Sequence, residues 1–345
     1  MRAMGELARA LDAWRRRREA FRWEVPPHFH FGRDVVDRFA EDPARPALLW
    51  RSPHGEEDRW TFARVRDASD RLAALLADLG VTPGQPVVVM LPKIPAWHVA
   101  MVAALKAGAL VVPSSTILRP KDLLYRLEHS AAVAVLAGPD EASTVDEAAR
   151  RAGALAHRIL LRPPGSRAAL PAGWVDGDAA PERDAPAPAT RAEDPALVYY
   201  TSGTTGPPKA VLHDHAYTFA QRQTASEWLG LRGDDRIWTT SDTGWAKAAY
   251  SVLFGPWSLG AEVFLYAGRF EARRELELLS EVKPDVFCAP PTEYRLLVKE
   301  DLGRLLRHPG LRECVSAGEP LNPEVIRAWR EATGLTIRDG YGQTE

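Results

Sequence analysis

The sequence predicts an α/β protein built on two mostly parallel, doubly wound sheets with helices on both faces. Three observations lead to this fold class. Short apolar runs alternate with segments of helical periodicity from Trp60 to Leu136, the alternation stops between Arg162 and Pro195, and it resumes at Ala196. Strands that alternate with helices of this length form parallel sheets covered on both faces. A length of 345 residues suits roughly two domains, so the interruption predicts two lobes.

Residues 1–24 precede this pattern and predict a basic, amphipathic and solvated helical extension. They contain the run Arg15–Arg18. A transit peptide is the alternative, although Glu6, Asp12 and Glu19 are acidic where such peptides avoid acidic residues. No apolar run reaches the roughly 18 residues that a membrane-spanning helix needs.

The first lobe is expected over residues 25–162. Thr61 is placed to cap a helix whose apolar positions recur every three or four residues as far as Leu79, and Gly80 is expected to end it. Strands are expected at 87–91, 110–112 and 133–136, and helices at 96–107 and 120–129.

Residues 163–195 predict a surface connection between the lobes rather than a folded element. Proline, alanine, glycine, aspartate and arginine dominate this stretch, and hydrophobic periodicity is lost.

The second lobe is expected over residues 196–345. Strands are expected at 196–200, 236–240, 262–266, 285–289, 313–317 and 336–339, with helices between them that include 214–229 and 323–333. Open parallel sheets bind ligands at the carboxyl ends of their strands. Five segments rich in glycine and hydroxyl groups follow these strands, so we expect all five to line one cleft: 201–206, 241–245, 290–294, 318–320 and 340–345.

The segment most informative about function runs from Tyr199 to Lys209, with the sequence Tyr-Tyr-Thr-Ser-Gly-Thr-Thr-Gly-Pro-Pro-Lys. Glycines let backbone N–H groups turn toward a ligand, hydroxyls donate hydrogen bonds, and the lysine adds a positive charge. This combination at the end of a strand suits a polyphosphate better than an ordinary surface turn. The spacing of a Walker loop is absent, because two prolines precede Lys209 and alanine follows it.

The last residues predict a site for a flat ring and a cation. Tyr341 lies between Gly340 and Gly342, so its ring is free to stack on a base such as adenine; a core tyrosine is the alternative. Thr344 and Glu345 follow as a hydroxyl and a carboxylate. Next to a polyphosphate a carboxylate repels unless it holds a hard cation such as Mg²⁺.

Composition limits the remaining function classes. The hydrophobic fraction of 46% and the formal net charge of −2 indicate a folded soluble protein and give no reason to expect a nucleic-acid partner. Cys288 and Cys314 lie in expected strands without metal-ligand spacing, so we expect buried packing residues in a reducing compartment, the cytoplasm.

The two motifs, as an ordered pair, resemble the phosphate-loop and adenine/magnesium signatures of the acyl-adenylate-forming enzymes. Segments 241–245 (Ser-Asp-Thr-Gly-Trp), 254–260 (Phe-Gly-Pro-Trp-Ser-Leu-Gly) and 317–321 (Ala-Gly-Glu-Pro-Leu) resemble one branch, the medium-chain acyl-CoA synthetases. Segments 105–113 and 122–127 extend the likeness into the first lobe, so that it covers residues 25–345.

The resemblance implies ATP-dependent activation of a carboxylic acid, of medium chain length, to acyl-AMP and then acyl-CoA, with Mg²⁺ and CoA as further cofactors. It also implies roles for individual residues. The nucleotide-binding set is Thr201, Ser202, Gly203, Thr204, Thr205, Gly206, Lys209, Gly318, Glu319, Pro320, Asp339, Gly340, Tyr341, Gly342, Gln343 and Thr344. The catalytic set is Thr204, Lys209, Thr344 and Glu345, of which Thr204 and Glu345 would approach the metal.

The resemblance also places two residues at the acid. In acetate-specific relatives a tryptophan occupies the position of Gly342, so an open pocket floor is expected here. Trp245 resembles the aromatic residue that gates the acyl tunnel, with a core tryptophan as the alternative.

The likeness ends at Glu345, before the ribose-binding Thr-Gly-Asp motif, the hinge and the mobile lid domain with its catalytic lysine. The chain is therefore expected to be a fragment or a truncated gene product. The sequence is compatible with three functions: a fatty-acid ligase, an aryl-acid or carrier-protein ligase, and a nucleotide-binding fragment without catalysis.

Overall fold

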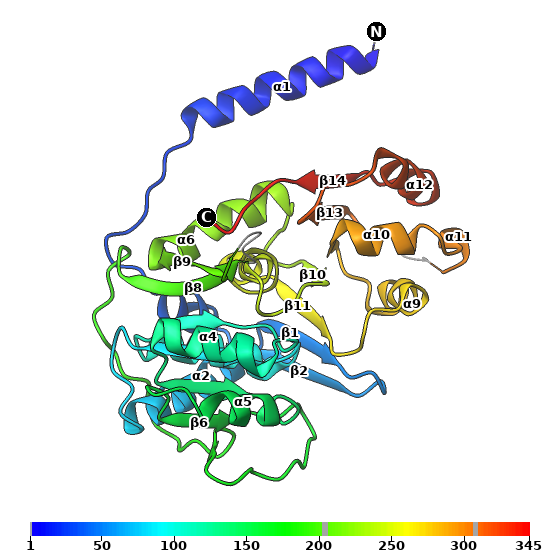
Figure 1. Ribbon diagram of the computed structural model, residues 1–345. Coiled ribbons are helices and arrows are strands. Elements are labelled where there is room, and N and C mark those ends of the chain that lie inside the picture. Colours follow the sequence, from blue (N-terminus) through cyan, green and yellow to red (C-terminus); the bar gives the residue numbers. More distant parts are fainter. Residues whose placement is uncertain (1, 202–205, 306–309) are drawn as a thin grey trace.

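The computed structural model describes residues 2–201, 206–305 and 310–345 and contains two seven-stranded sheets (Figure 1). In sheet I the order is β7-β6-β5-β3-β4-β8-β9, and in sheet II it is β14-β13-β12-β10-β11-β1-β2. Neighbouring strands are parallel except for β8–β9 and β1–β2, which form one antiparallel edge in each sheet. The predicted fold class is confirmed.

The strands of sheet I are β3 (Pro86–Met90), β4 (Leu110–Pro113), β5 (Ala134–Ala137), β6 (His157–Leu160), β7 (Val175–Asp176), β8 (Pro195–Thr201) and β9 (Lys209–Asp214). Those of sheet II are β1 (Pro46–Arg51), β2 (Glu57–Thr61), β10 (Arg236–Thr239), β11 (Glu262–Tyr266), β12 (Val286–Ala289), β13 (Glu313–Ala317) and β14 (Ile337–Gly340).

The helices before β8 are α1 (Arg2–Ala20), η1 (Gly32–Asp37), α2 (Phe62–Asp78), α3 (Pro95–Lys106), α4 (Pro120–Ser130) and α5 (Ala142–Ala149). Those after β9 are α6 (His215–Gln223), η2 (Thr224–Trp228), α7 (Ala246–Ala248), η3 (Ala249–Leu253), α8 (Phe254–Leu259), α9 (Ala272–Val282), α10 (Pro291–Leu297), α11 (Leu302–Leu305) and α12 (Pro323–Thr333).

Helix ends follow the local signals in the sequence. The Thr61 hydroxyl accepts a hydrogen bond from the backbone N–H of Arg64 at 3.2 Å, which caps α2. Gly80, just beyond the end of α2, and Gly334, the C-cap of α12, have φ of +85° and +77°, a conformation that favours glycine. Asp214 caps α6 by accepting from Tyr217 N at 2.9 Å, and the helical path continues through η2 to Trp228.

The sheets do not divide where the sequence pattern pauses. β8, expected in the second lobe, and β9, a strand that the sequence pattern did not predict, extend sheet I through the parallel pairing of Val111 with Leu197. β1 and β2, which the pattern did not reveal, extend sheet II through β11. Membership of the two sheets therefore does not follow the expected division between residues 25–162 and 196–345, because strands pair with partners distant in the sequence.

The connection at 163–195 is also more structured than expected. It contains β7, which pairs with β6, and the side chain of Trp174 is buried against sheet I. This Pro- and Ala-rich stretch has no hydrophobic periodicity, so the pattern of its sequence does not predict these contacts.

Helix α3 lies in the core that joins the sheets. Nearly every one of its residues is buried, and its cluster includes Val87 of sheet I and Val263 of sheet II. Lys106 at its end is 1% exposed, and its ammonium donates to Asp37 and Asp70, both at 2.6 Å. These two carboxylates compensate a buried charge and tie η1 and α2 to α3.

No helix in the part of the chain that the structure describes is both long and apolar enough to cross a membrane.

Candidate functional site

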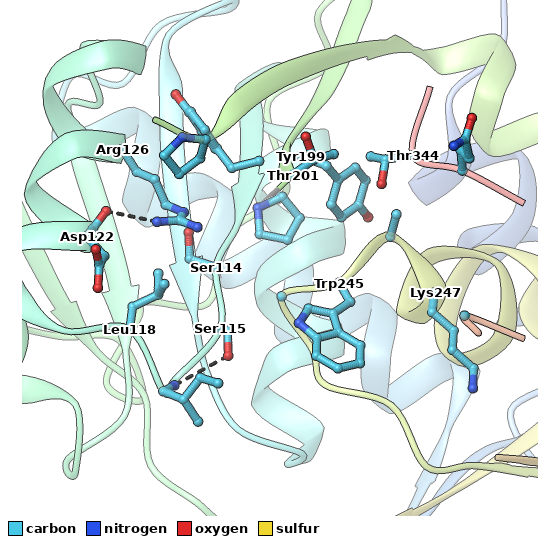
Figure 2. Close-up of a pocket in the computed structure, with 18 of the residues that line it drawn as sticks. Ser114, Ser115, Leu118, Asp122, Arg126, Tyr199, Thr201, Trp245, Lys247 and Thr344 are labelled. Carbon is cyan, nitrogen blue, oxygen red and sulfur yellow. Dashed lines mark hydrogen bonds between the residues drawn. The ribbon is translucent and has the colours of Figure 1, made fainter. Parts of the chain in front are cut away.

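Two adjoining cavities lie where the carboxyl ends of strands from both sheets meet. The larger, cavity A, has a volume of about 610 Å³ and is shown in Figure 2. On the side of sheet I and α4, cavity A is lined by Ser114, Ser115, Arg126 and Thr201. On the opposite side it is lined by Trp245, Lys247, Gly318, Gly342, Gln343 and Thr344.

Cavity B, of about 500 Å³, lies beside it and has a more aromatic wall. Tyr217, Trp228 and Tyr250 line it together with Ala317 and the stretch 340–343. The two cavities share Ala246, Tyr250, Gly342 and Gln343, so residues 342 and 343 lie at their junction.

The expected single cleft is confirmed for four of the five segments. Segments 201–206, 241–245, 318–320 and 340–345 each place residues in the lining of cavity A. Because β8 belongs to sheet I, the site lies between two sheets rather than along one edge, which corrects the expectation.

Segment 290–294 does not line either cavity and begins α10 instead. Its Glu293 is directed into the protein: burial raises the pKa of this carboxyl, while the Thr240 hydroxyl and the Lys247 ammonium oppose the rise. Lys247 is itself buried, with Nζ 3.5 Å from the Ala317 carbonyl, and Figure 2 shows it directed away from Thr344. The content of proline and hydroxyl residues does not distinguish the buried N-terminus of a helix from a ligand-binding loop.

The phosphate-loop segment connects the two strands of a hairpin. Thr201 ends β8 and pairs with Lys209, the first residue of antiparallel β9, so a strand intervenes before the expected helix. Thr201 lines cavity A, while Gly206 and Lys209 are exposed nearby in the hairpin. The four remaining predicted residues, Ser202, Gly203, Thr204 and Thr205, lie outside the described residues.

The predicted adenine residues fall on the loop after β13, at the end of β14 and on the segment that follows β14. Gly318 lines cavity A and has a φ of +115°, which requires glycine. Asp339 of β14 accepts a hydrogen bond from Leu321 N at 3.2 Å and so joins this strand to the loop after β13. Glu319 is exposed and pairs with Arg295 at 2.6 Å, and Pro320 is exposed beside it.

Two aromatic side chains are available to ligands. Tyr341 is 92% exposed at cavity B, which contradicts the alternative of a core tyrosine. Trp245 is 53% exposed at cavity A, which contradicts the alternative of a core tryptophan. A Cβ added at Gly342 would meet nothing within 4 Å, in agreement with an open floor at the junction.

The segment that presents Trp245 is held tightly against sheet I. Asp242 accepts from the Ser115 hydroxyl at 2.7 Å and from Gly244 N at 2.8 Å. The Thr243 hydroxyl donates to the Leu91 carbonyl at 2.6 Å. A Cβ at Gly244 would lie 2.1 Å from Ser115 N, so only glycine permits this approach of two backbones.

His213 is a site residue that the sequence argument missed. Its Nε2 lies 2.8 Å from the Thr344 carbonyl oxygen, and its ring stacks on Tyr217 with centroids 4.0 Å apart. Burial lowers the pKa of His213, opposed by the bond to Thr344 and by Asp214. Because a carbonyl only accepts, Nε2 of the neutral ring carries the proton and donates it. No local pattern links a strand residue to a partner 131 positions away.

The residues present are compatible with a magnesium site. Among residues 2–201, 206–305 and 310–345, no group of three or more His, Cys, Asp and Glu side chains could hold a metal ion. Mg²⁺ bound to a nucleotide needs only one or two protein ligands, because phosphate oxygens and water fill its other positions. Glu345 is exposed next to Thr344 and has the right chemistry; Thr204 lies outside the described residues.

Comparison with known proteins gives a consistent result. Residues 35–345 match the model of the family described as AMP-binding enzyme. The mitochondrial acyl-coenzyme A synthetase ACSM3 of Mus musculus is 39% identical over 345 residues, which cover 95% of this chain and 58% of that protein. The uncharacterized acyl-CoA ligase YtcI of Bacillus subtilis (strain 168) is 36% identical, over 90% of this chain and 58% of that protein.

Solved structures of CoA ligases are also similar to this chain. The acyl-CoA synthetase of Brucella canis superposes with a TM-score of 0.84 at 29% identity, over 93% of this chain and 59% of that one. The anthranilate CoA ligase AuaEII, solved with anthranoyl-AMP, has a TM-score of 0.80 at 26% identity, over 93% of this chain and 60% of that one. The chain thus spans somewhat more than half the length of the relatives it matches.

Proposed function

The chain belongs to the AMP-binding enzyme family, and on this premise we propose that it provides the nucleotide- and acid-binding part of an ATP-dependent acid–CoA ligase. The observation that supports the proposal is the junction of cavities A and B at Gly342 and Gln343. There the cavity bordered by the phosphate hairpin meets a second cavity with a mainly apolar lining, as a reaction between a polyphosphate and an apolar acid requires.

In the proposed reaction, a carboxylate oxygen of the acid attacks the α-phosphorus of ATP. A carboxyl–phosphate bond forms, the bond from the α-phosphorus to the bridging oxygen breaks, and pyrophosphate leaves. The thiol of CoA then attacks the acyl carbon, loses its proton and releases AMP. The first step needs no general base, because a carboxylic acid with a pKa of about 4–5 is ionised at pH 7. Positioning and charge compensation are therefore the tasks of the protein.

The phosphates are assigned to the hairpin wall of cavity A. The segment from Thr201 to Lys209 offers hydroxyls, backbone N–H groups and one ammonium to the β- and γ-phosphates. Thr344 is placed at the α-phosphate and Glu345 at Mg²⁺, while Gly318 and Tyr341 enclose the adenine. Mg²⁺, when bound, supplies positive charge to the oxygens of the leaving pyrophosphate.

The acid is assigned to cavity B, with its carboxylate at the junction; Trp245, the expected gate of the acyl tunnel, lines cavity A and does not border this acid site. A volume of about 500 Å³ lies within the range of small-molecule sites, and Gly342 leaves the entrance open. A fatty acid of medium length is the leading substrate. An aryl acid is the second candidate, because Tyr217, Trp228 and Tyr250 place three aromatic rings in the wall. A reducing, cytoplasmic setting is part of the proposal, since both cysteines are buried free thiols.

Equilibrium binding of non-hydrolysable acyl-adenylate analogues to the 345-residue chain tests this assignment without requiring a complete catalytic cycle. Analogues from acetyl to dodecanoyl, and a benzoyl analogue, are compared with AMP by calorimetry. We expect the preferred acyl group to improve affinity about tenfold or more over AMP. Equal affinity for AMP and all acyl analogues would contradict an acid site in cavity B.

Acid-dependent ATP–pyrophosphate exchange on the same chain then separates catalysis from binding. Exchange that peaks at intermediate acid length supports the fatty-acid ligase, and a peak at benzoate supports the aryl candidate. Binding of ATP without exchange for any acid would favour a nucleotide-binding chain that does not catalyse adenylation by itself.

A further inference from the structure

Helix α1 is a part of the molecule that the proposed function does not use. Figure 1 shows it standing clear of the two sheets, connected to η1 by an extended segment. An ion pair between Arg17 and Glu227, 3.7 Å apart, bridges it to the body. Both side chains are more than half exposed, so this contact holds the helix only weakly.

Positive charge is concentrated in this extension. Residues 1–24 contain seven arginines and four acidic residues and so have a net charge of +3, although the formal net charge of the whole chain is −2. Four of the arginines are consecutive, at positions 15–18. The extension is therefore a cationic surface on a body that is itself anionic.

The same extension exposes large apolar side chains. Leu11, Trp14, Phe21 and Trp23 are 44%, 49%, 37% and 55% exposed. Leu11, Trp14 and Arg18 recur at spacings of three and four residues, which places them on one side of the helix. Arg15 and Arg17 follow at positions that flank this side, so an aromatic and aliphatic stripe has guanidinium groups on both borders.

We propose that α1 and residues 21–24 bind the headgroup region of an anionic lipid bilayer, with the helix parallel to the surface. Amphipathic helices of this kind bury Trp, Phe and Leu at the acyl boundary while Arg contacts lipid phosphates. Nucleic acid fits less well, because it would satisfy the arginines and leave the apolar stripe in water. A second copy of the chain would bring two runs of four arginines together, which repel each other.

A consequence follows for the acid, and it rests on the proposed function. Glu227, the partner of Arg17, also lines cavity B. A bilayer that binds α1 while this ion pair is formed therefore lies near a residue that lines cavity B, and amphiphilic acids concentrate in that bilayer.

Vesicle flotation of the full 345-residue chain tests the proposal. The vesicles are phosphatidylcholine alone or phosphatidylcholine mixed with phosphatidylglycerol, at low ionic strength and again in about 0.5 M NaCl. Two variants alter α1: L11S/W14S removes the apolar stripe, and R15Q/R16Q/R17Q/R18Q removes the charge. Matched controls alter the body: L296S changes a leucine that is 44% exposed like Leu11, and R150Q/R151Q/R327Q/R330Q changes four exposed arginines.

The wild-type chain is expected to bind the anionic vesicles at least about tenfold better than the neutral ones, and less well at high salt. Each α1 variant is expected to lose about tenfold or more in vesicle affinity, whereas both controls stay close to wild type. Three outcomes would overturn the proposal: no binding of wild type to anionic vesicles, equal losses in the controls, or dimerisation measured by light scattering that L11S/W14S abolishes in the absence of vesicle binding. Failure of acid binding in cavity B would leave the vesicle result unaffected.

Discussion

Two segments that line cavity A, its first wall (241–245) and its second wall (340–345), are held in different ways. The segment 241–245 is fixed by three side-chain hydrogen bonds and by a glycine packed against the backbone of Ser115. The segment 340–345 has Tyr341 almost fully exposed, and the hydrogen bond from His213 reaches its backbone at Thr344. The first wall is fixed by the fold. The second is open to the solvent, so a ligand that stacks on Tyr341 would add contacts that the protein itself does not make.

The close packing of Gly244 in the first wall gives the largest expected effect on stability. Gly244→Ala would place a methyl group 2.1 Å from Ser115 N, and backbone cannot move aside as a side chain can. We expect a loss of about 3 kcal/mol in the free energy of unfolding, measured by urea denaturation. Gly342→Ala in the second wall is the matched control, because its added methyl group meets nothing within 4 Å. Similar losses for both variants would contradict the difference between the walls.

A pH effect is expected behind the first wall. His98 of α3 donates through Nε2 to the Val252 carbonyl at 3.0 Å, and burial lowers its pKa to about 3. As the pH falls below about 6.5, the unfolded chain binds a proton here before the folded chain does, so stability present at neutral pH is lost. The contribution of His98 between pH 6.5 and pH 5 is about 2 kcal/mol.

Chemical denaturation at pH 7 and pH 5 measures this effect when wild type is compared with His98→Gln. The variant is expected to lose less stability than wild type on acidification, whatever its stability at pH 7. An identical loss in both proteins would show that His98 does not titrate on unfolding.

Substrate selection at the junction gives a smaller effect. Gly342→Trp would fill the open space between the cavities, so long acyl groups lose access to cavity B. We expect preference among acyl-adenylate analogues to shift toward acetyl and propionyl by about tenfold. Gly318→Ala is unsuitable as a control because of its positive φ, whereas Gly342→Ala tests the position with minimal bulk. An unchanged chain-length profile would remove Gly342 from the acid site.

The weakest expected effect concerns the second wall. His213→Phe keeps an aromatic ring beside Tyr217 and removes the donor to Thr344. We expect a change of about 1 kcal/mol or less in unfolding free energy and a few-fold loss of AMP affinity, measured by calorimetry. A loss of stability as large as that of Gly244→Ala would mean that the second wall is as firmly held as the first.

The features that the sequence predicts well are those with local causes. The cap at Thr61, the glycine after α2 and the alternation of strands and helices depend on neighbours within a few positions, and each is confirmed. The exposure of Tyr341 between two glycines belongs to the same group.

The features that it misses depend on partners far along the chain. β9 is a mostly exposed edge strand with weak apolar alternation, so its pairing with β8 was not visible. The hydrogen bonds from Ser115 to Asp242 and from His213 to Thr344 join residues more than 100 positions apart. Segment 290–294 has the same composition as a ligand loop and differs from one only in its burial, which is a property of the fold.

Each sheet includes a hairpin from the other part of the chain, and this has a consequence for folding. An antiparallel hairpin from late in the chain completes sheet I, and one from early in the chain completes sheet II. A single cut between residues 162 and 195 would therefore leave both sheets incomplete, each with an unpaired edge. The chain is expected to unfold in one cooperative transition, and neither half is expected to serve as an independent module in recombination. Contacts of such long sequence separation also predict slow folding.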